Sequence, residues 1–239
     1  YSNLKDIKLE LMPDERDNTK AYLLIVLKTT HHQEVFATLC EDLINGIKEI
    51  SEEQKVIKDL LNRLEKWKSL FDKASLEGLN QEEQRGLYGE LYFIRKWLSG
   101  KGNQQNCIQS WAGPEKAIRD FQLLDWAVEV KTTHGNNHQK IQISSERQLD
   151  TENLNSLILF HLSLEVQQQN GETLNSIIDE TIELLDNDIT TQTQFRSKLL
   201  QSGYFNHHRY LYETSGYQIR NENFYFVNNN FPRIEEKEI

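Results

Sequence analysis

The stretch FQLLDWAVEVKTTH, residues 121–134, decides how the middle of the chain folds. In it, the apolar residues Val128 and Val130 alternate with the charged residues Glu129 and Lys131. Alternate side chains of a β-strand share one face and lie roughly 6.6 Å apart along the chain. The pattern therefore predicts a strand with one core face and one charged face, on which a carboxylate and an ammonium are neighbours.

The composition limits the class of protein. A chain of 239 residues is long enough for one large domain, or for a compact domain with an attached subdomain. Its 10 Phe, 9 Tyr and 4 Trp residues can build a core, although only 37% of the chain is hydrophobic. No run approaches the roughly 20 apolar residues of a membrane span, so we expect a soluble protein without a membrane partner.

The cysteines and the first residues predict a cytoplasmic protein. Cys40 and Cys107 have neither CxxC nor metal-ligand spacing, which suits reduced thiols in a reducing compartment. The first ten residues are charged and lack an apolar stretch, so we expect no signal peptide. Because the chain starts at Tyr1 rather than at Met, we expect a preceding segment to be missing.

The net charge of −10 counts against a nonspecific nucleic-acid binder, because phosphate backbones repel an acidic surface. The charge is unevenly spread. Residues 76–150 hold ten acids and nine bases, a net charge of −1, so that −9 falls on the rest of the chain. A cation bound among the acids of 76–150 would make the local field mildly positive, so the acidity does not exclude a DNA partner.

The N-terminal part predicts a small α+β cap. Residues 4–12 and 21–28 have the pattern of strands separated by a turn. Apolar residues then recur at helical spacing over 37–48 and 52–71. We assign these helical stripes to core packing and to no function.

Residues 81–98 predict an amphipathic helix with Asn80 as its N-cap. Gly86 and Gly89 each cost about 1 kcal/mol inside a helix. We therefore expect another element to pack closely against this helix.

The middle of the chain alternates short apolar runs with turns, which predicts short strands. Residues 153–166 form a longer apolar run that fits a strand buried on both faces. Helical periodicity returns over 172–202. The Tyr- and Phe-rich segment 203–231 favours antiparallel strands, and we expect its aromatic side chains to pack in a core rather than to stack on bases. The short strands are expected at 107–111, 119–123, 126–133 and 140–145.

Asp120, Glu129 and Lys131 are the residues most suited to chemistry. Two carboxylates can hold a hard cation such as Mg²⁺, and an adjacent lysine can orient a bound water and stabilise charge on a phosphate. The short QLLD connection lets Asp120 return to the face that carries the other two. Asp125 is the competing carboxylate, but on a continuous strand it lies roughly 13 Å from Glu129, too far to share one ion.

The run DFQLLDWAVEVKTT resembles the motif of the PD-(D/E)XK nuclease superfamily, with Asp120, Glu129 and Lys131 at the motif positions. The sequence departs from the motif at its proline, because Arg119 precedes the aspartate. Glu90 in GLYGEL matches a glutamate that the superfamily often carries on the preceding helix. The wider likeness is to bacterial PD-(D/E)XK motif proteins found beside restriction and phage-defence genes, and it extends over GLYGELYFIRKWL, SWAGPEKAIRDF, EVKTT, ISSERQL and YFVNNNFPRI.

This resemblance implies a mixed α/β (α+β) fold, in which a restriction-endonuclease-like core has a central mixed β-sheet flanked by helices. We expect an N-terminal α+β cap over 1–75 and the nuclease core over 76–170. A C-terminal helix with antiparallel strands, over 171–239, is expected to pack on that core.

The resemblance also implies a Mg²⁺-dependent endonuclease that hydrolyses DNA phosphodiester bonds in a bacterial restriction-modification or phage-defence system. By that likeness, the metal ligands are Asp120, Glu129, Glu90 and the carbonyl of Val130, and Mn²⁺ can substitute for Mg²⁺. Lys131 positions the attacking water. Asp120, Glu129, Lys131 and Glu90 are thus the implied catalytic residues, for either one or two ions.

The implied partners are DNA, other subunits of such a system, and a second copy in a homodimer that cuts both strands. Gln142, Ser144 and Gln148 are candidates for contacts to the nucleic-acid backbone or to the metal shell, with plain surface residues as the alternative. Two other functions stay open. One is a catalytically inactive DNA-binding or scaffold subunit, and the other is a hydrolase of a different phosphorylated substrate.

Interpretations that give these residues no catalytic or metal-binding role also stay open. Glu129 and Lys131 can form an exposed salt bridge on an edge strand, and Glu90 can be a solvated helix residue. His134 and His138 have a spacing seen in zinc sites, but they lack a further ligand pair, so we expect a mobile loop. We expect no metal at the adjacent pairs 31–32 and 207–208, whose side chains would point apart on a strand.

Overall fold

The computed structural model divides into two compact units, Tyr1–Gly78 and Leu79–Ile239, and each is described by itself. Among the described residues, no helix has the length and apolar character needed to cross a membrane. The histidine pair 31–32 and His138 lie outside the described residues. The structure describes residues 7–30, 33–48, 50–73, 78–135, 140–185 and 188–233.

The first unit combines a two-stranded antiparallel ribbon with two helices, as the sequence predicts. The carboxylate of Asp42, on the first helix, accepts hydrogen bonds from Arg63 at 2.6 Å and from Trp67 at 2.9 Å, both on the second helix. Residues 4–6 of the predicted first strand lie outside the described residues. The elements are β1 (Ile7–Pro13), β2 (Ala21–Leu27), α1 (Gln33–Ile47) and α2 (Glu53–Lys73).

The second unit is organised by a five-stranded sheet of β3 (Phe121–Leu123), β4 (Trp126–His134), β5 (Ser156–Gln168), β7 (Ser215–Phe226) and β6 (Glu172–Thr173), in this order. β4 and β5 are parallel, and the other neighbouring pairs are antiparallel. The sheet is therefore mixed, as predicted. The division of the chain at residues 75 and 170 stays a prediction.

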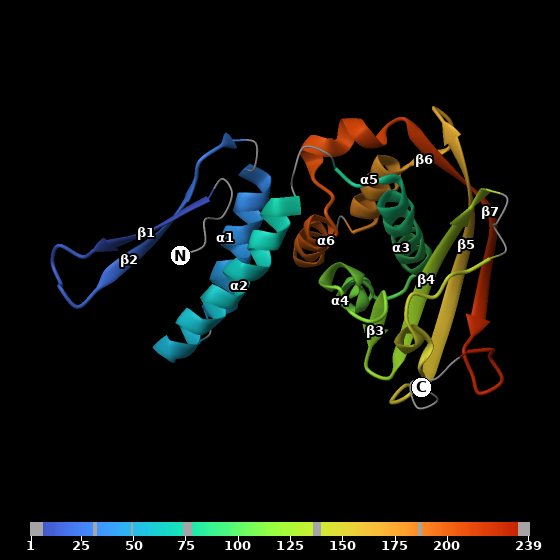
Figure 1. The fold of residues 1–239 in the computed structure, drawn as a ribbon, viewed down its shortest axis with the longest axis horizontal. Coiled ribbons are helices and arrows are strands. Elements are labelled where there is room, and N and C mark those ends of the chain that lie inside the picture. The colour runs from blue at the N-terminus through green and yellow to red at the C-terminus, as the bar shows by residue number, and fades with distance from the viewer. Residues whose placement is uncertain are drawn as a thin grey trace. The chain divides into compact units, whose positions relative to one another are not determined.

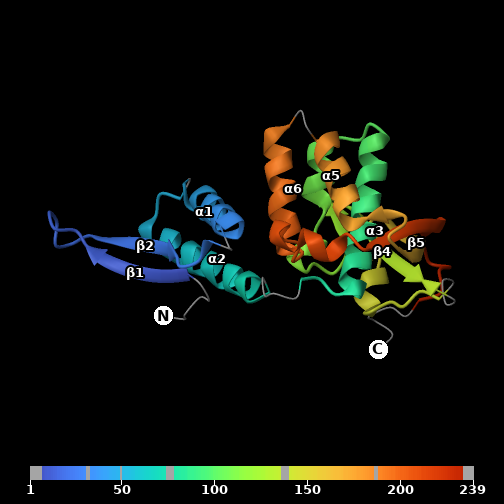
Figure 2. The same ribbon diagram turned by 90° about the horizontal axis from the view of Figure 1, so that it is seen from above.

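Four helices lie on one face of this sheet (Figures 1 and 2): α3 (Gln81–Ser99), α4 (Gln104–Ser110), α5 (Leu174–Leu184) and α6 (Ile189–Gln201). α3 packs against both β4 and α5, and α4 packs against α6. A central mixed sheet flanked by helices confirms the predicted restriction-endonuclease-like α+β fold.

Helix α3 begins where the sequence predicts. The Asn80 side chain accepts a hydrogen bond from the amide of Glu83 at 3.0 Å, and the Glu83 carboxylate accepts one from the amide of Asn80 at 2.9 Å. A Cβ atom added to Gly89 would lie 2.4 Å from Cγ2 of Thr132, so the predicted close packing is confirmed there. A Cβ atom added to Gly86, by contrast, would meet nothing within 4 Å, so the close approach is made at Gly89.

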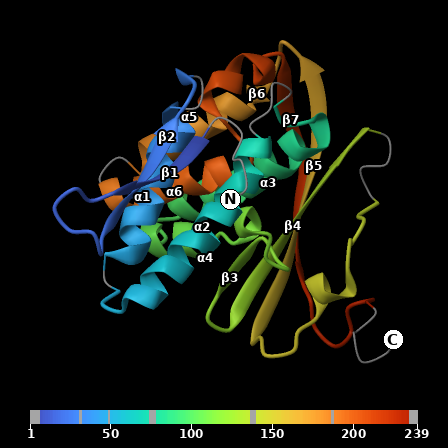
Figure 3. The ribbon, with the colours of Figure 1, turned by 60° about the vertical axis from the view of Figure 1, so that its left-hand side comes forward.

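Strand β4 has two different faces, and β3 and β5 flank it (Figure 3). Val128 and Val130 belong to the larger core under α3, whereas Ala127 belongs to a smaller core on the opposite face. Glu129 shares the face of Ala127 and is only 1% exposed. The reading of Glu129 and Lys131 as an exposed pair on an edge strand is therefore wrong.

Two of the predicted short strands are wrong. Residues 107–110 belong to α4, which Asn103 caps by accepting a hydrogen bond from the amide of Asn106 at 2.8 Å. A short apolar run fits a helix or a strand equally well, and here the N-cap at Asn103 favours the helix. Residues 140–145 alternate like a strand but form none, because their isoleucines pack onto the smaller core without pairing into the sheet.

The C-terminal expectations are confirmed in part. Most of the apolar run 153–166 belongs to β5, which begins at Ser156 and lies between β4 and β7. The helical segment 172–202 contains α5 and α6. The segment 203–231 holds the single long strand β7, preceded by a 3₁₀ helix at Asn206–Tyr212. The expectation of several antiparallel strands there is wrong, because β7 takes β5 and β6 as its partners.

Candidate active site

The β3–β4 hairpin brings Asp120 back to the charged face of β4. Phe121 pairs with Val128 in the antiparallel register. One further step of this register sets Asp120 opposite Glu129. The return that the sequence requires is therefore made by a hairpin whose turn is only two residues long, 124–125.

Asp120 is held at both its side chain and its backbone. Its Oδ2 atom accepts a hydrogen bond from the amide of Val130 at 2.7 Å. Its carbonyl accepts two more, from the amides of Ala112 at 2.7 Å and Gly113 at 3.0 Å. These bonds fix the carboxylate beside β4 before any ligand arrives.

Asp125, the competing carboxylate, lies at the tip of the hairpin and has a structural role. The preceding Leu124 has a φ of 54°, in the left-handed region that a tight turn requires. The Asp125 carboxylate accepts a hydrogen bond from the Asn155 side chain, and its carbonyl accepts one from the Asn155 amide at 2.7 Å. Asp125 therefore ties the hairpin to the start of β5.

Glu129 and Lys131 meet as i and i+2 neighbours. Nζ of Lys131 lies 2.9 Å from Oε1 of Glu129, and the two side chains are 17% and 1% exposed. Oε2 of Glu129 is buried and has no hydrogen-bond partner among the described residues. A buried carboxylate oxygen without a donor costs folding free energy, on the order of 1–3 kcal/mol.

Glu90 of α3 approaches the same place from the helical side of the sheet. Its Oε2 accepts a hydrogen bond from the indole of Trp111 at 2.5 Å. A Cβ atom added to Gly113 would lie 2.7 Å from this Oε2 and 3.3 Å from Oδ1 of Asp120. The side of Gly113 on which a side chain would stand thus faces the carboxylates of both Glu90 and Asp120.

Burial raises the pKa of all three carboxyl groups. It lifts the pKa of Glu90 well above its usual range, and repulsion from Asp120 and Glu129 adds to the effect. It raises the pKa of Asp120, against the hydrogen bond from Val130 and the charge of Lys131. It raises the pKa of Glu129 to about 7, with repulsion from Asp120 as the second cause. Full ionisation of the cluster is therefore favoured by a positive charge beyond that of Lys131.

The donor chemistry of the cluster fits a hard divalent cation, which takes oxygen ligands and offsets repulsion between carboxylates. The unpartnered Oε2 of Glu129 is an acceptor that such an ion, or its water, would satisfy. Within the described ranges, no three His, Cys, Asp or Glu side chains are spaced to hold a metal ion as they stand. Mg²⁺ is usually held by one or two carboxylates together with waters and substrate oxygens, so three preassembled ligands are not required.

The predicted substrate contacts lie in the segment between β4 and β5. Gln142 and Ser144 are exposed, and Oε1 of Gln148 accepts a hydrogen bond from the amide of Ser144 at 3.0 Å. The carbonyl of Gln148 accepts a hydrogen bond from Arg119, the residue before Asp120, at 3.3 Å. The structure thus links Gln148 to the carboxylate cluster through its backbone, and a role in substrate binding stays a prediction.

The sequence reasoning missed Trp111, Gly113 and Lys198. Trp111 binds Glu90, and the ammonium of Lys198 on α6 donates a hydrogen bond to the carbonyl of Trp111. It also pairs with Glu115 at 3.0 Å. The Gly-Pro pair at 113–114 signalled a turn, but no local pattern connects this turn with Lys198, more than eighty residues further along the chain.

Comparison with known proteins gives one family. A protein-family model described as "Putative PD-(D/E)XK family member (DUF4420)" matches residues 2–239. No curated protein and no solved structure matches the chain.

Proposed function

We propose, from the premise that this chain belongs to the PD-(D/E)XK family DUF4420, that it is a metal-dependent endonuclease that hydrolyses DNA phosphodiester bonds. One observation carries the proposal. The carboxylates of Glu90 and Asp120 meet at Gly113, next to the buried Glu129–Lys131 pair, in the order and residue types of a nuclease motif.

Asp120 and Glu129, with the carbonyl of Val130, would hold the ion, and Glu90 would hold a second ion or its water shell. A bound Mg²⁺, or Mn²⁺ in its place, would supply Lewis acidity to the phosphate and lower the pKa of a coordinated water. Lys131 orients the attacking water and stabilises negative charge that develops on the phosphate. Because the Lys131 ammonium already lies 2.9 Å from Glu129, it needs no large rearrangement to act there.

Trp111 keeps Glu90 in place during this reaction. Its indole N–H donates to the Glu90 carboxylate at 2.5 Å, and Lys198 holds the Trp111 carbonyl from the other side. Glu90 is therefore held towards Asp120 although the charges of the two repel each other.

The proposed setting is a bacterial restriction or phage-defence system, in the cytoplasm, with other subunits or a second copy of the chain as partners. The net charge of −10 favours this setting over solitary, nonspecific DNA binding, because partner subunits can supply the basic surface that this chain lacks.

A second candidate function is a catalytically inactive DNA-binding or scaffold subunit. It is favoured by the net charge of −10, which suits a subunit whose partners make most of the contacts to DNA. This alternative predicts that the wild-type protein associates with DNA or with a partner and never cleaves DNA.

The experiment is plasmid nicking in Mg²⁺ or Mn²⁺ by the wild-type protein, Asp120→Asn and Lys131→Ala. Loss of one preorganised charged group costs about 10²–10³-fold in rate, so we expect both variants to be slower by about that factor. Matched controls are Asp59→Asn and Lys58→Ala on α2, which change the same residue types outside the proposed site.

Equal nicking by the wild type and both site variants would refute the proposed site. A wild-type protein that binds DNA but leaves it intact in either metal would favour the inactive subunit. Activity on small phosphodiesters without activity on DNA would move the proposal to another phosphorylated substrate.

A further inference from the structure

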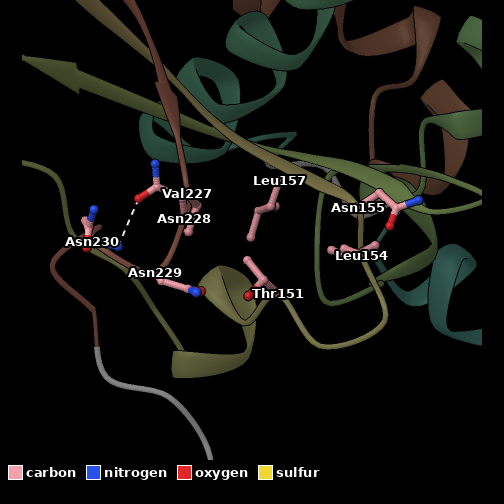
Figure 4. Close-up of a pocket in the computed structure, with 8 residues that line it drawn as sticks. All are labelled: Thr151, Leu154, Asn155, Leu157, Val227, Asn228, Asn229 and Asn230. Atoms are coloured by element: carbon pink, nitrogen blue, oxygen red, sulfur yellow. Dashed lines mark hydrogen bonds between the residues drawn. The ribbon is translucent and has the colours of Figure 1, made fainter.

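A recess lies at the start of β5, on the face of the sheet that carries Ala127 and Glu129. It is open to solvent and has a volume of about 350 Å³, at the small end of the roughly 300–1,000 Å³ of ligand pockets. It lies between the end of β7 and the segment that enters β5 (Figure 4). The residues that line it are Thr151, Leu154, Asn155, Leu157, Val227, Asn228, Asn229 and Asn230.

The lining combines an apolar wall with an amide rim. Leu154, Leu157 and Val227 supply the wall, and Asn155 with the run 228–230 supplies four side-chain amides. None of the eight lining residues is ionisable, although the guanidinium of Arg233 donates a hydrogen bond to the hydroxyl of Thr151, one of the eight, at 2.9 Å. A flat ligand with apolar faces and a hydrogen-bonding edge matches this chemistry.

We infer that this pocket takes one heterocyclic base of the nucleic-acid strand that is held at the carboxylate cluster. The inference rests on the proposed function, because it requires that the substrate is a nucleic acid. Base faces pack against apolar side chains, and asparagine amides pair with the edge of a base, adenine being the best match for a bidentate contact.

The pocket and the carboxylates are close enough for a single strand to reach both. Leu157 pairs with Ala127, and Leu159 pairs with Glu129 in the same parallel register. The distance from Leu157 to Glu129 is thus about 8 Å, because the two residues are one strand apart across the sheet and two residues apart along it. Bases rise by about 3.4 Å each along a strand of duplex DNA, so this gap corresponds to two or three nucleotides.

Part of the rim is fixed and part of it is available. The Asn228 side chain accepts a hydrogen bond from the amide of Asn230 at 3.0 Å, and its carbonyl accepts one from Phe231 at 2.9 Å. The Asn155 amide group is bound to Asp125. The Asn229 side chain is exposed and makes no hydrogen bond to the rest of the described chain. Asn229 is therefore the amide best placed to pair with a ligand.

A short segment joins the two sites physically. The guanidinium of Arg119, next to Asp120, donates hydrogen bonds to the carbonyls of Gln148 and Asp150. Thr151, the next residue, already lines the pocket. Arg119 occupies the place of the motif's proline, so the departure from the motif is what anchors the pocket segment to the active site.

The test uses the four deoxynucleosides as probes, added to the full chain in EDTA and followed by backbone NMR shifts. We expect at least one deoxynucleoside, with deoxyadenosine the first candidate, to shift signals of 151–157 and 227–230. We expect Asn229→Ala to weaken that binding about fivefold or more. The control is Asn62→Ala, an exposed asparagine on α2, which should leave the affinity unchanged.

Shifts confined to other regions, or equal affinity in Asn229→Ala and wild type, would overturn the inference. The probes carry no phosphate and the solution no metal, so the outcome is independent of cleavage. Nucleoside binding at the pocket in a protein that never nicks DNA would refute the proposed nuclease and leave a base-binding site. DNA nicking without nucleoside binding at the pocket would refute the base-binding inference and leave the proposed nuclease.

Discussion

Two clusters of charged side chains lie along helix α3, and they differ in how many hydrogen-bond donors their carboxylates have. In the first, Glu172 of β6 accepts hydrogen bonds from the guanidinium of Arg95 and, at 2.7 Å, from the hydroxyl of Tyr88. Arg95 also pairs with Glu180 of α5. Both oxygens of Glu172 therefore have donors, and the cluster joins three elements of the fold.

The second cluster has too few donors. The charge of Lys131 acts on Glu90, Asp120 and Glu129, and that of Arg119 acts on Glu129, yet Oε2 of Glu129 has no donor among the described residues. The pKa of each of these acids is raised, chiefly by burial. A network that only held the fold together would match its acids with donors, as the Arg95 cluster does. The carboxylate cluster costs folding free energy that a ligand can offset.

The largest expected effect on stability comes from breaking the satisfied cluster. Arg95→Ala should lower the free energy of unfolding by about 3 kcal/mol, because it leaves Glu172 partly buried without its charge partner. Urea denaturation of the metal-free protein measures this. The matched control is Arg220→Ala, whose pair with Glu165 is 40% and 39% exposed, and which should cost about 1 kcal/mol or less. A loss in Arg95→Ala as small as in the control would remove the contrast.

The opposite sign is expected in the carboxylate cluster. Glu129 has a pKa of about 7 in the folded protein against 4.5 for an ordinary glutamate, so the folded state binds the proton more tightly. The stability of the wild type should therefore fall as the pH rises from about 4.5 to about 7. Glu129→Gln lacks this titration and should be more stable than wild type at pH 8, by on the order of 2 kcal/mol, and about equal at pH 4.

The measurement is urea denaturation at both pH values in EDTA, with Glu172→Gln as the matched change in the satisfied cluster. Glu172→Gln should be less stable than wild type at pH 8, because it weakens the pairing with Arg95. Destabilisation by Glu129→Gln at pH 8 would show that its carboxylate is a structural group like Glu172.

The smallest expected effect concerns the positioning of Glu90. Trp111→Phe keeps the buried ring and removes the N–H that holds the Glu90 carboxylate. Loss of this bond would raise the pKa of Glu90 further, because the bond opposes the effect of burial. The Mg²⁺ concentration for half-maximal nicking should rise about fivefold, equivalent to about 1 kcal/mol, with little change in the maximal rate.

A purely structural role for Trp111 would instead lower stability and leave the Mg²⁺ dependence unchanged. Trp97→Phe is a control on the same unit, because Trp97 contacts Phe93 and Trp126 in the aromatic packing rather than a carboxylate.

Local pattern was enough to predict how the centre of the candidate site is arranged. Strand alternation places Glu129 and Lys131 on one face, and a two-residue turn is the shortest way to return Asp120 to them. The helix around Glu90 was readable from its apolar face and its Asn80 cap. These features depend on residues within about ten positions of one another.

Features that depend on distant residues were not predictable in this way. Trp111 reaches Glu90 across 21 positions and Lys198 reaches Trp111 across 87, and neither contact leaves a periodic signal. The segment 140–145 alternates like a strand, but it covers the smaller core instead of joining the sheet. Only the packed fold decides between these two uses of the same pattern.

Gly113 has a consequence for how such a protein can change over time. Any side chain at this position would put its first carbon 2.7 Å from Oε2 of Glu90, an atom that Trp111 holds in place. A single methyl group would therefore force one of the two acids to retreat, while the sheet and helices around it kept their packing. On the proposed function, one codon change would thus separate an active member of this family from an inactive one, and position 113 is where an inactive paralogue should be sought first.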